Sequence, residues 1–375
     1  MTTEPADEGT APKGALHGLK VVDLTRVLAG PYCTQILGDH GADVLKVEAP
    51  QGDETRRWGP PFIDGSAAYF MGVNRNKRGM VLDFNEDDAR TTLAGLLKGA
   101  DVLVENFKAG TLERWGFGRE VLEEDYPGLV HCRITGFGDD GPHGGLPGYD
   151  AAVQAMTGLM SINGEPDADP LRAGVPVVDL VTGLNAVIGI LLALQERARS
   201  GLGQFVDVSL FDSGLSVLHP HSANYLFTGD LPARTGNAHP NITPYDTFET
   251  ATGPIFLAVG SDRQFAKLCE LIGLPGLVGD ERFTTNARRG QHRSELKGEL
   301  EAALASLEVD TLADRLIRNG VPCAPVFNLE QALNHPQTQR RNMVWQDDTY
   351  RGVGAPVHLS RSPASLRLKP PKLDD

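Results

Sequence analysis

The sequence predicts an α/β protein with a parallel sheet in a large domain and a second, smaller α+β domain. Short apolar runs alternate with helical patterns over roughly the first 200 residues, and this alternation is typical of a parallel sheet covered by helices. The first unit comprises a strand at residues 19–24, a Gly30-Pro31 turn with a helix at 32–40, and a strand at 43–48. A strand–helix–strand unit of this kind indicates a doubly wound sheet.

The following elements continue the alternation. We expect strands at residues 80–84, 101–105, 130–135 and 204–212, and a helix at 86–99. A Gly- and Pro-rich loop at 139–148 follows the expected strand at 130–135, and such loops commonly carry functional residues in open α/β sheets. The first unit lacks the G-x-G-x-x-G motif, so the sequence does not predict a nicotinamide dinucleotide site.

The smaller domain follows a linker rich in Pro, Gly and Asn at residues 232–244. We expect a strand at 254–259 and helices at 263–272, 294–307 and 309–319. The helices are amphipathic, so they can cover one face of a small sheet. A segment of roughly ninety residues with its own apolar pattern indicates a separate domain.

Composition excludes several function classes. Asp and Glu number 49 against 35 Lys and Arg, which gives a formal charge of −14 and argues against a nucleic-acid partner. A local basic cleft could still bind an anionic ligand. The longest apolar stretch, residues 186–194, is too short to span a bilayer, so no membrane partner is expected.

The four cysteines lie far apart, and no C-x-x-C motif or Cys/His cluster accompanies them. The sequence therefore predicts no zinc or other metal site and no disulfide framework, and scattered thiols favour a reducing cytoplasm. Residues 1–15 are polar. We expect a disordered tail there and not a signal peptide, which needs a basic start and an apolar centre.

Two aspartates in apolar, Gly-rich surroundings are the candidate functional residues. Asp150 follows Gly148 and Tyr149 and opens an apolar stretch, and Asp179 stands between two apolar runs. A buried carboxylate is costly unless it is paired or functional. For Asp179 the sequence leaves two interpretations open: an N-cap that holds the first turn of a buried helix, or a functional carboxylate.

Short motifs, none of them specific alone, occur in a characteristic order along nearly the whole chain. They are Asp23-Leu24-Thr25-Arg26-Val27-Leu28-Ala29-Gly30-Pro31, Lys46-Val47-Glu48, Asn74-Arg75-Asn76-Lys77-Arg78, Val104-Glu105-Asn106-Phe107, Gly148-Tyr149-Asp150, Val178-Asp179, Gly201-Leu202-Gly203-Gln204 and Gly320-Val321-Pro322-Cys323-Ala324-Pro325-Val326. By their order and spacing, the chain from residue 16 to residue 367 resembles the class III CoA-transferase family. That family includes formyl-CoA transferase, carnitine CoA-transferase and α-methylacyl-CoA racemase.

The resemblance implies an enzyme that moves CoA from an acyl-CoA donor to a carboxylic acid by ping-pong covalent catalysis. The family's nucleophile is an aspartate at the position of Asp179, which would attack the donor thioester and become an aspartyl-CoA thioester. This favours the functional interpretation of Asp179, and a helix N-terminus would also stabilise the carboxylate. Succinyl-CoA is a common donor in the family and is the donor we expect. CoA enters as a co-substrate, with no metal and no nicotinamide.

Asp150 matches an active-site glutamate position of formyl-CoA transferase. We expect it to orient or hydrogen-bond the reacting acyl group, with a second helix cap as the alternative. Tyr149 stands where the racemase branch has a histidine, and a tyrosine with its pKa of about 10 shuttles protons poorly near neutral pH. Transfer is therefore favoured. An acyl-CoA racemase or isomerase and a non-catalytic CoA-binding protein remain the alternatives.

The resemblance also implies a CoA site that combines cations with an apolar slot. We expect it to include Val27, Leu28, Ala29, Arg75, Asn106, Phe107 and Arg114. Arg26 and Lys46 are further candidates for the phosphates, although any one cation could instead be a solvated surface charge. The family's Gly-rich lid is replaced by residues 236–241, in which Gly236, Asn237, His239 and Asn241 are expected to contact substrate or to stabilise the loop.

The implied fold is a Rossmann-like large domain built from both ends of the chain. We expect the tail at residues 1–15, the first part of the large CoA-binding domain at 16–230, the small domain with its linkers at 231–325, and a C-terminal part returning to the large domain at 326–375. The family forms interlocked homodimers, so the expected partners are acyl-CoA, a carboxylic acid and a second copy of the chain.

Overall fold

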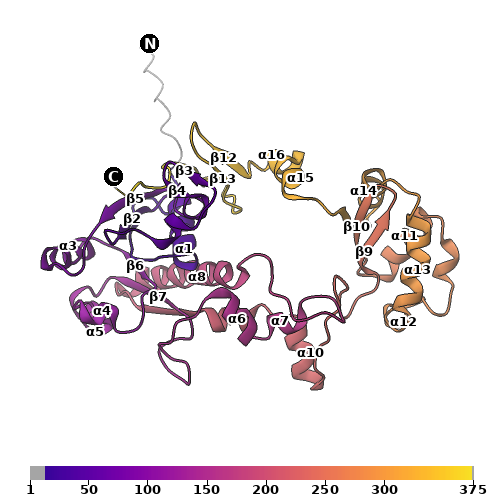
Figure 1. Ribbon diagram of the computed structural model, residues 1–375, viewed down its shortest axis with the longest axis horizontal. Coiled ribbons are helices and arrows are strands. Elements are labelled where there is room, and N and C mark those ends of the chain that lie inside the picture. Colours follow the sequence, from indigo (N-terminus) through magenta and orange to yellow (C-terminus); the bar gives the residue numbers. More distant parts are fainter. Residues whose placement is uncertain (1–12, 374–375) are drawn as a thin grey trace, which may run out of the picture. The chain divides into compact units, whose positions relative to one another are not determined.

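The computed structural model describes residues 13–373, which divide into two compact units (Figure 1). The first unit contains the described part of residues 1–158, together with 173–218 and 336–373. The second unit contains residues 159–172 and 219–335. Most of the tail predicted at residues 1–15 lies outside the described residues.

A six-stranded parallel sheet forms the centre of the first unit. Its strands, in spatial order, are β5 (Lys77–Val81), β2 (Asp43–Glu48), β1 (Lys20–Asp23), β6 (Val102–Glu105), β7 (Val130–Thr135) and β8 (Phe205–Ser209). The register places Val22 of β1 beside Leu45 of β2 and Leu103 of β6. The prediction of an α/β class with a parallel sheet is confirmed.

Two predicted strands are misplaced at their ends. The strand expected at 80–84 runs from Lys77 to Val81 instead. These residues pair with β2, and the fully buried ammonium of Lys77 lies 3.0 Å from the Asp23 carboxylate. The strand expected at 204–212 ends at Ser209, whose hydroxyl accepts a hydrogen bond from the Asp212 N–H and caps the next helix. In both cases a polar side chain with a tertiary or capping partner lies at the boundary.

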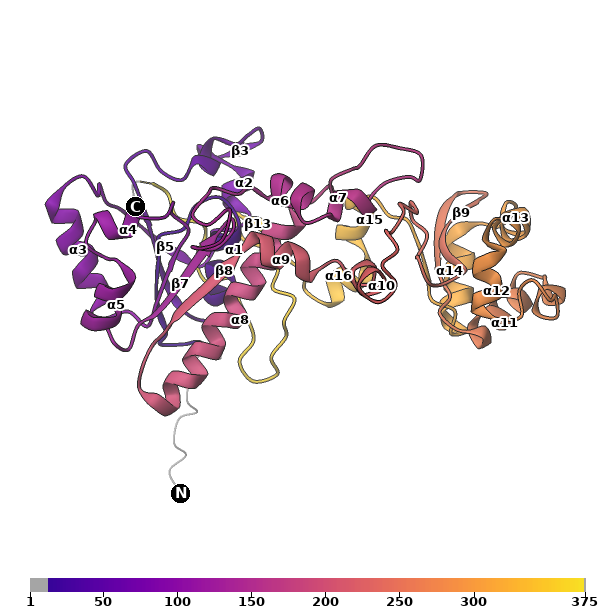
Figure 2. The same cartoon turned by 90° about the horizontal axis from the view of Figure 1, so that it is seen from below.

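Helices cover both faces of the sheet (Figures 1 and 2). On one face α3 (Asp87–Leu97), α4 (Thr111–Arg114) and α5 (Arg119–Asp125) contribute buried side chains to a core that includes Val22, Leu45 and Leu103. On the other face lie α1 (Ala29–Asp39) and α8 (Val177–Ser200), which pack against each other, with α8 also on β7 and β8. This layering buries the central strands on both sides, as their continuous apolar sequences require.

The remaining elements of the first unit are short. They are the 3₁₀ helix η1 (Glu54–Arg57), α2 (Ala68–Met71), α6 (Asp150–Met156), α9 (Leu210–Ser216), α16 (Pro336–Arg340), and the antiparallel pairs β3 (Phe62–Ile63) with β4 (Ser66–Ala67) and β12 (Val344–Gln346) with β13 (Arg351–Val353).

Helix α8 has the length and the apolar composition of a membrane span. Its buried residues, among them Ala186, Ile190 and Ala193, pack on α1 and the sheet, as in a core helix of a globular protein. The opposite side exposes an apolar stripe at Leu184, Ile188, Leu191 and Leu192. These positions repeat at helical spacing, so they form one continuous face.

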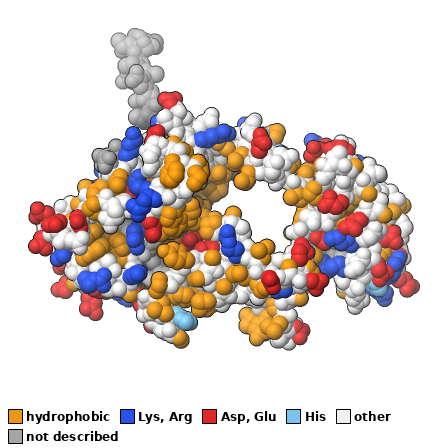
Figure 3. All heavy atoms as spheres, viewed as in Figure 1, with side chains coloured by type: hydrophobic (Ala, Val, Ile, Leu, Met, Phe, Trp, Pro, Cys, Tyr) orange, Lys and Arg blue, Asp and Glu red, His pale blue; other side chains and the backbone are white. Residues whose placement is uncertain are grey.

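The second unit contains a three-stranded antiparallel sheet in the order β11 (Cys323–Pro325), β10 (Gly253–Ala258) and β9 (Tyr245–Thr250). Its core combines Phe248, Ile255 and Leu257 with side chains of α11 (Asp262–Leu271), α13 (Arg293–Leu304) and α14 (Val309–Arg318). The other elements are α7 (Leu159–Ile162), α10 (His221–Thr228), η2 (Pro275–Val278), α12 (Asn286–Gln291) and α15 (Leu329–Asn334). Figure 3 shows acidic and basic side chains mixed over this unit.

Candidate active site

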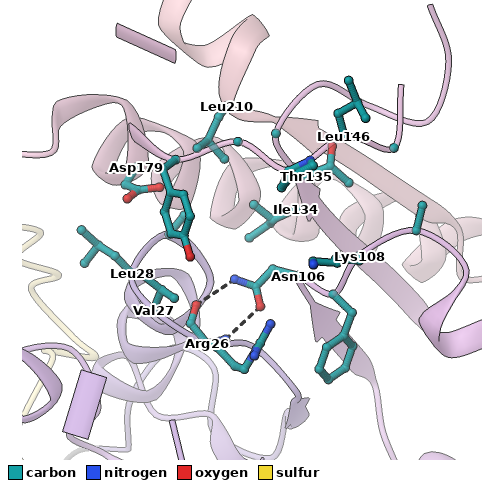
Figure 4. A pocket seen from close by; sticks show the side chains of 18 of the residues that line it. Arg26, Val27, Leu28, Asn106, Lys108, Ile134, Thr135, Leu146, Asp179 and Leu210 are labelled. Atoms are coloured by element: carbon teal, nitrogen blue, oxygen red, sulfur yellow. Dashed lines mark hydrogen bonds between the residues drawn. The ribbon is translucent and has the colours of Figure 1, made fainter. Parts of the chain in front are cut away.

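A pocket lies at the carboxyl ends of β1, β6 and β7, where open parallel sheets bind their ligands. The segments that follow these strands supply most of its lining (Figure 4). The first turn of α8, the start of α9 and the first residue of η1 complete it. The polar or charged lining residues are Arg26, Glu54, Asn106, Lys108, Thr135, Tyr149 and Asp179, and the remaining lining includes Val27, Leu28, Ala29, Phe107, Ile134, Leu146 and Leu210.

Helix α8 places Asp179 at the pocket. The helix begins after Pro176, and Asp179 is the third helical residue, so it stands in the first turn. Burial raises the pKa of Asp179 to about 7, and the negative charge of Asp150 adds to this shift. The partial positive charge of the helix N-terminus acts in the opposite direction and favours the carboxylate. A carboxyl group in such a setting changes its charge near neutral pH.

Asp150 caps the helix that carries Asp179. One carboxylate oxygen of Asp150 accepts hydrogen bonds from the backbone N–H groups of Val178 and Asp179, at 2.9 and 3.1 Å. The other oxygen accepts from the Gln154 side-chain amide, whose own oxygen accepts the Ala173 N–H at 2.9 Å. The capping interpretation of Asp179 is wrong, because Pro176 occupies the N-cap position and Asp179 is the third helical residue. The cap comes from Asp150, from another helix.

Replacing Asp150 by alanine should leave the N–H groups of Val178 and Asp179 without their acceptor. We expect a loss of about 1–2 kcal/mol of stability and a fall in kcat of about 10–100-fold, because Asp179 loses its fixed position. Asp150→Asn keeps an acceptor oxygen and should lose less of both. Urea unfolding and steady-state kinetics test this, with Asp87→Ala in the exposed first turn of α3 as control. Equal losses in the alanine and asparagine variants would contradict the capping role.

Two glycines allow the loop after β7 to return to the sheet. A Cβ on Gly136 would lie 2.6 Å from the backbone nitrogen of Gly148, so any side chain there would force the two segments apart. The close contact places Tyr149 and Asp150 directly beside the end of β7. Tyr149 is 60% exposed and lines the pocket as the residue that precedes α6.

The turn after β1 forms the opposite wall of the pocket. The Asn106 side chain binds both backbone groups of Arg26, accepting from its N–H and donating to its carbonyl, each at 2.8 Å. This bridge, drawn as dashed lines in Figure 4, joins the segments after β1 and β6. These segments carry Val27, Leu28 and Phe107. Of the residues predicted for the CoA site, the pocket thus brings together Val27, Leu28, Ala29, Asn106 and Phe107.

The two predicted arginines do not line the pocket. Arg75 is 3% exposed, and its guanidinium binds the Asp39 carboxylate at 2.7 Å and the Val353 carbonyl at 2.6 Å. A buried, paired guanidinium is not free to bind phosphate, so the prediction for Arg75 is corrected. Arg114 lies in the exposed part of α4 and donates to the Thr111 hydroxyl. Lys46 is buried beside Asp53.

Sequence reasoning missed two residues of the site, Lys108 and Tyr69. Lys108 lines the pocket directly after Asn106 and Phe107, and its place beside a recognised motif was the signal that could have revealed it. Tyr69 of α2 lies close enough for the charges of Asp179 and Asp150 to act on its hydroxyl. Burial, with these two carboxylates, raises the pKa of Tyr69 to about 12. No sequence pattern connects Tyr69 to an aspartate more than a hundred residues away.

The loop predicted to contact substrate lies in the second unit. Asn237 donates to the Thr247 hydroxyl, and the His239 ring nitrogen accepts the backbone N–H of Asn241. Gly236 has a positive φ of 60°. These contacts stabilise the loop, and its role toward the substrate stays a prediction. Among residues 13–373, no group of three or more His, Cys, Asp and Glu side chains is arranged to hold a metal ion.

Comparison with known proteins identifies the family. Residues 16–375 match the family described as CoA-transferase family III. The chain is 41% identical over 375 residues to the succinate–glutarate CoA-transferase of Agrobacterium fabrum, covering 97% of this chain and 94% of that protein. It is 39% identical over 377 residues to the succinyl-CoA:mesaconate CoA-transferase of Haloarcula hispanica, with coverage of 96% and 94%.

A solved structure agrees with these relatives. The crystal structure of a CaiB/BaiF family protein from Brucella suis superposes with a TM-score of 0.87 and 44% identity, covering 96% of this chain and 97% of that one. The resemblance drawn from the sequence motifs is confirmed: the chain belongs to CoA-transferase family III and is a CoA-transferase.

Proposed function

We propose that this enzyme transfers CoA from succinyl-CoA to a second carboxylic acid, through a covalent aspartyl-CoA thioester on Asp179. The observation that carries the proposal is the position of Asp179, in the first turn of α8 and in the lining of the pocket. The names of the relatives support the substrates, because they pair succinate or succinyl-CoA with glutarate or mesaconate. The acceptor we expect is therefore a short dicarboxylic acid.

The reaction would run through two kinds of acyl intermediate. A carboxylate oxygen of Asp179 attacks the donor thioester carbon, giving a mixed anhydride and the CoA thiolate. The thiolate then attacks the aspartyl carbonyl, which releases the donor acid and leaves aspartyl-CoA. The acceptor carboxylate then attacks the aspartyl-CoA thioester, which gives a second mixed anhydride and the CoA thiolate. The thiolate attacks the acceptor's carbonyl carbon in this anhydride, which releases the acceptor acyl-CoA and frees the Asp179 carboxylate. Each intermediate stays activated toward the next nucleophile.

The pKa of Asp179 predicts the pH dependence of the free enzyme. The carboxylate is the attacking form, and burial together with Asp150 raises its pKa to about 7. The rate constant kcat/KM should therefore fall as the pH drops below about 7, approaching tenfold per pH unit. Asp150→Asn removes one of the causes of the shift and should move the midpoint to lower pH. A profile of kcat/KM from pH 5 to 9 measures both values, and a flat profile would contradict this assignment.

CoA would extend from Asp179 into a second, adjoining pocket. The two pockets share Arg26, Glu54 and Phe107, and the second one adds Gln51, Arg57, Asn85 and the aromatic ring of Trp115. Trp115 stacks on Phe84 with ring centroids 4.2 Å apart. Aromatic rings suit the adenine base. Arg26 at the junction, with Lys108 in the first pocket and Arg57 in the second, suits the phosphates.

Removing Arg26, which lines both pockets, or Lys108, which lines the first, should weaken CoA binding. We expect the Kd of CoA to rise about 5–50-fold in Arg26→Ala and in Lys108→Ala, because each variant loses a charge-assisted contact to phosphate. Isothermal titration with CoA measures the effect. Arg199→Ala, which removes an exposed arginine from the last turn of α8, is the matched control and should bind as the wild type does. Unchanged Kd values in both pocket variants would exclude this path for CoA.

The donor and the acceptor are tested by incubating the enzyme with succinyl-CoA and glutarate, mesaconate or oxalate, and by following each acyl-CoA chromatographically. Release of succinate with formation of the new acyl-CoA supports the proposal. Deuterium exchange at the α-carbon of an acyl-CoA without a change of acid would indicate a racemase or isomerase. CoA binding without turnover would indicate a binding protein.

A homodimer in the cytoplasm completes the proposal. The exposed apolar stripe on α8 is the kind of surface that a second copy would cover. The four cysteines are free thiols, which suits a reducing compartment. Light scattering of the purified protein at micromolar concentration measures the dimer.

A further inference from the structure

The turn opposite Asp179 contains a strained residue. Val27 has a φ of 69°, in the left-handed region. In the described part of the chain, the other non-glycine residues with positive φ are Asp64, Asn76 and Asn342. Asp and Asn tolerate this region, but a β-branched side chain is a true outlier there. Such strain persists only where the surroundings hold it, and it clusters at functional sites.

A buried ion pair holds this turn from behind. The Val27 N–H lies 3.4 Å from one carboxylate oxygen of Asp53, and the other oxygen lies 3.2 Å from the Lys46 ammonium. Both side chains of the pair are fully buried. The same ammonium donates to the Thr25 carbonyl at 2.8 Å. The pair therefore binds the backbone on both sides of Arg26, at Thr25 and at Val27.

Asp53 is itself fixed from several directions. The oxygen that faces Val27 also accepts the N–H of Thr55 at 3.0 Å and its hydroxyl at 2.8 Å, and the backbone N–H of Asp53 donates to Glu48. A carboxylate held this firmly can keep a strained turn in place. The negative charge of Asp53 is also needed to neutralise Lys46, because a buried ammonium without a partner destabilises the fold.

The turn packs against α8 directly below Asp179. Gly183 is four residues after Asp179, so the two residues lie on the same side of the helix. A Cβ on Gly183 would lie 2.7 Å from the Ala29 carbonyl oxygen. The strained turn and the catalytic helix are therefore in backbone contact, and Figure 4 shows Val27, Leu28 and Asp179 at the same pocket. A shift of the turn would change the wall that faces the reacting carboxylate.

We propose that Asp53, together with Lys46, is a positioning residue for CoA transfer: it holds the left-handed Val27 turn in place across the pocket from Asp179. This inference rests on the proposed function of the site. Asp53 does not line the pocket with Asp179. It lies at the adjoining pocket, but its side chain is fully buried, so it acts through the turn. It is expected to affect the chemical step more than substrate binding, because displacement of a reacting group by a fraction of an ångström lowers the rate.

The test compares Asp53→Asn in two backgrounds, wild type and Val27→Gly. In the wild-type background kcat should fall about 10–100-fold, while KM for the donor changes less than about threefold. Glycine adopts positive φ without strain. The double variant Val27→Gly/Asp53→Asn should therefore have a kcat within about threefold of that of Val27→Gly alone, whatever Val27→Gly does to kcat by itself. If Asp53→Asn gives no soluble protein, Lys46→Met with Asp53→Asn removes both buried charges and takes its place.

Asp39→Asn is the matched control. Asp39 is equally buried and pairs with Arg75 at 2.7 Å, but it lies outside the pocket. It should lower stability as Asp53→Asn does and leave kcat unchanged. Hydrogen exchange of the backbone at residues 25–31 should speed up in Asp53→Asn and stay the same in Asp39→Asn.

Three results would overturn the inference: an unchanged kcat in Asp53→Asn, an equal loss of kcat in both backgrounds, or unchanged hydrogen exchange at residues 25–31 in Asp53→Asn. Failure of the proposed function is recognised separately, by a wild-type enzyme that is inactive with every donor and acceptor pair. In that case hydrogen exchange at residues 25–31 still tests whether Asp53 holds the Val27 turn in place. An unchanged exchange rate in Asp53→Asn would show that it does not.

Discussion

Replacing Asp179 by asparagine should lower kcat for CoA transfer by about 10³–10⁵-fold, because the amide cannot attack a thioester. Asparagine has almost the same size and keeps the helix start, so the fold and CoA binding should be retained. Steady-state rates with succinyl-CoA and an acceptor acid, together with CoA titration, separate the two effects. The loss should appear in kcat and not in the Kd of CoA.

A second carboxyl group provides the control for this experiment. Asp207 on β8 also has a raised pKa, through burial and the neighbouring Asp139, but it does not line the pocket. Asp207→Asn should therefore keep kcat within about threefold of the wild type. A substantial rate in purified Asp179→Asn, free of wild-type enzyme, would contradict the assignment of Asp179 as the nucleophile.

The same substitution should stabilise the protein at alkaline pH. The carboxyl of Asp179 has a pKa of about 7 in the folded chain and about 4 in the unfolded chain. Because the pKa is higher in the folded chain, the carboxyl of Asp179 contributes its full stabilisation below pH 4, where it is protonated. This contribution is lost as the pH rises through 7. Above pH 7 the charged, half-buried carboxylate therefore destabilises the fold, by at most about 4 kcal/mol.

Urea unfolding of wild type and Asp179→Asn between pH 4 and pH 9 measures this effect. The difference in the free energy of unfolding should be small near pH 4, grow between pH 4 and pH 7, and stay constant above about pH 8. Asp207→Asn serves again as the comparison. A difference that does not depend on pH would show that the pKa of Asp179 is not raised in the folded chain. It would also remove the basis for the predicted fall of kcat/KM below pH 7.

The sheet could be predicted because its strands carry their signal locally. The apolar runs at 19–24, 43–48, 101–105 and 130–135 match β1, β2, β6 and β7 closely, since buried parallel strands need continuous apolar sequence. The two aspartates stood out for the same reason, as charges in apolar surroundings. β9 was missed because it is half-buried and its Tyr, Asp, Thr and Glu residues disguise the strand pattern.

What the sequence could not provide are contacts between distant segments. Asp150 was expected to orient or hydrogen-bond the acyl group, or else to cap a helix. Its hydrogen bonds to the start of α8 join residues 28 and 29 positions apart, which no local pattern specifies. Arg75 resembled a phosphate ligand until Asp39 was found to neutralise it. The strain at Val27 follows from its tertiary anchors, because no local rule places a β-branched residue in the left-handed region.

The central claim, that Asp179 carries CoA, is tested most directly by trapping the intermediate. The enzyme is incubated with succinyl-CoA alone, treated with hydroxylamine or borohydride, digested and mapped by mass spectrometry. We predict a donor-dependent modification on the peptide that contains Asp179, absent from Asp179→Ala and from enzyme without donor. Transfer that proceeds with no modification of Asp179, or with a modification at another residue, would contradict the mechanism.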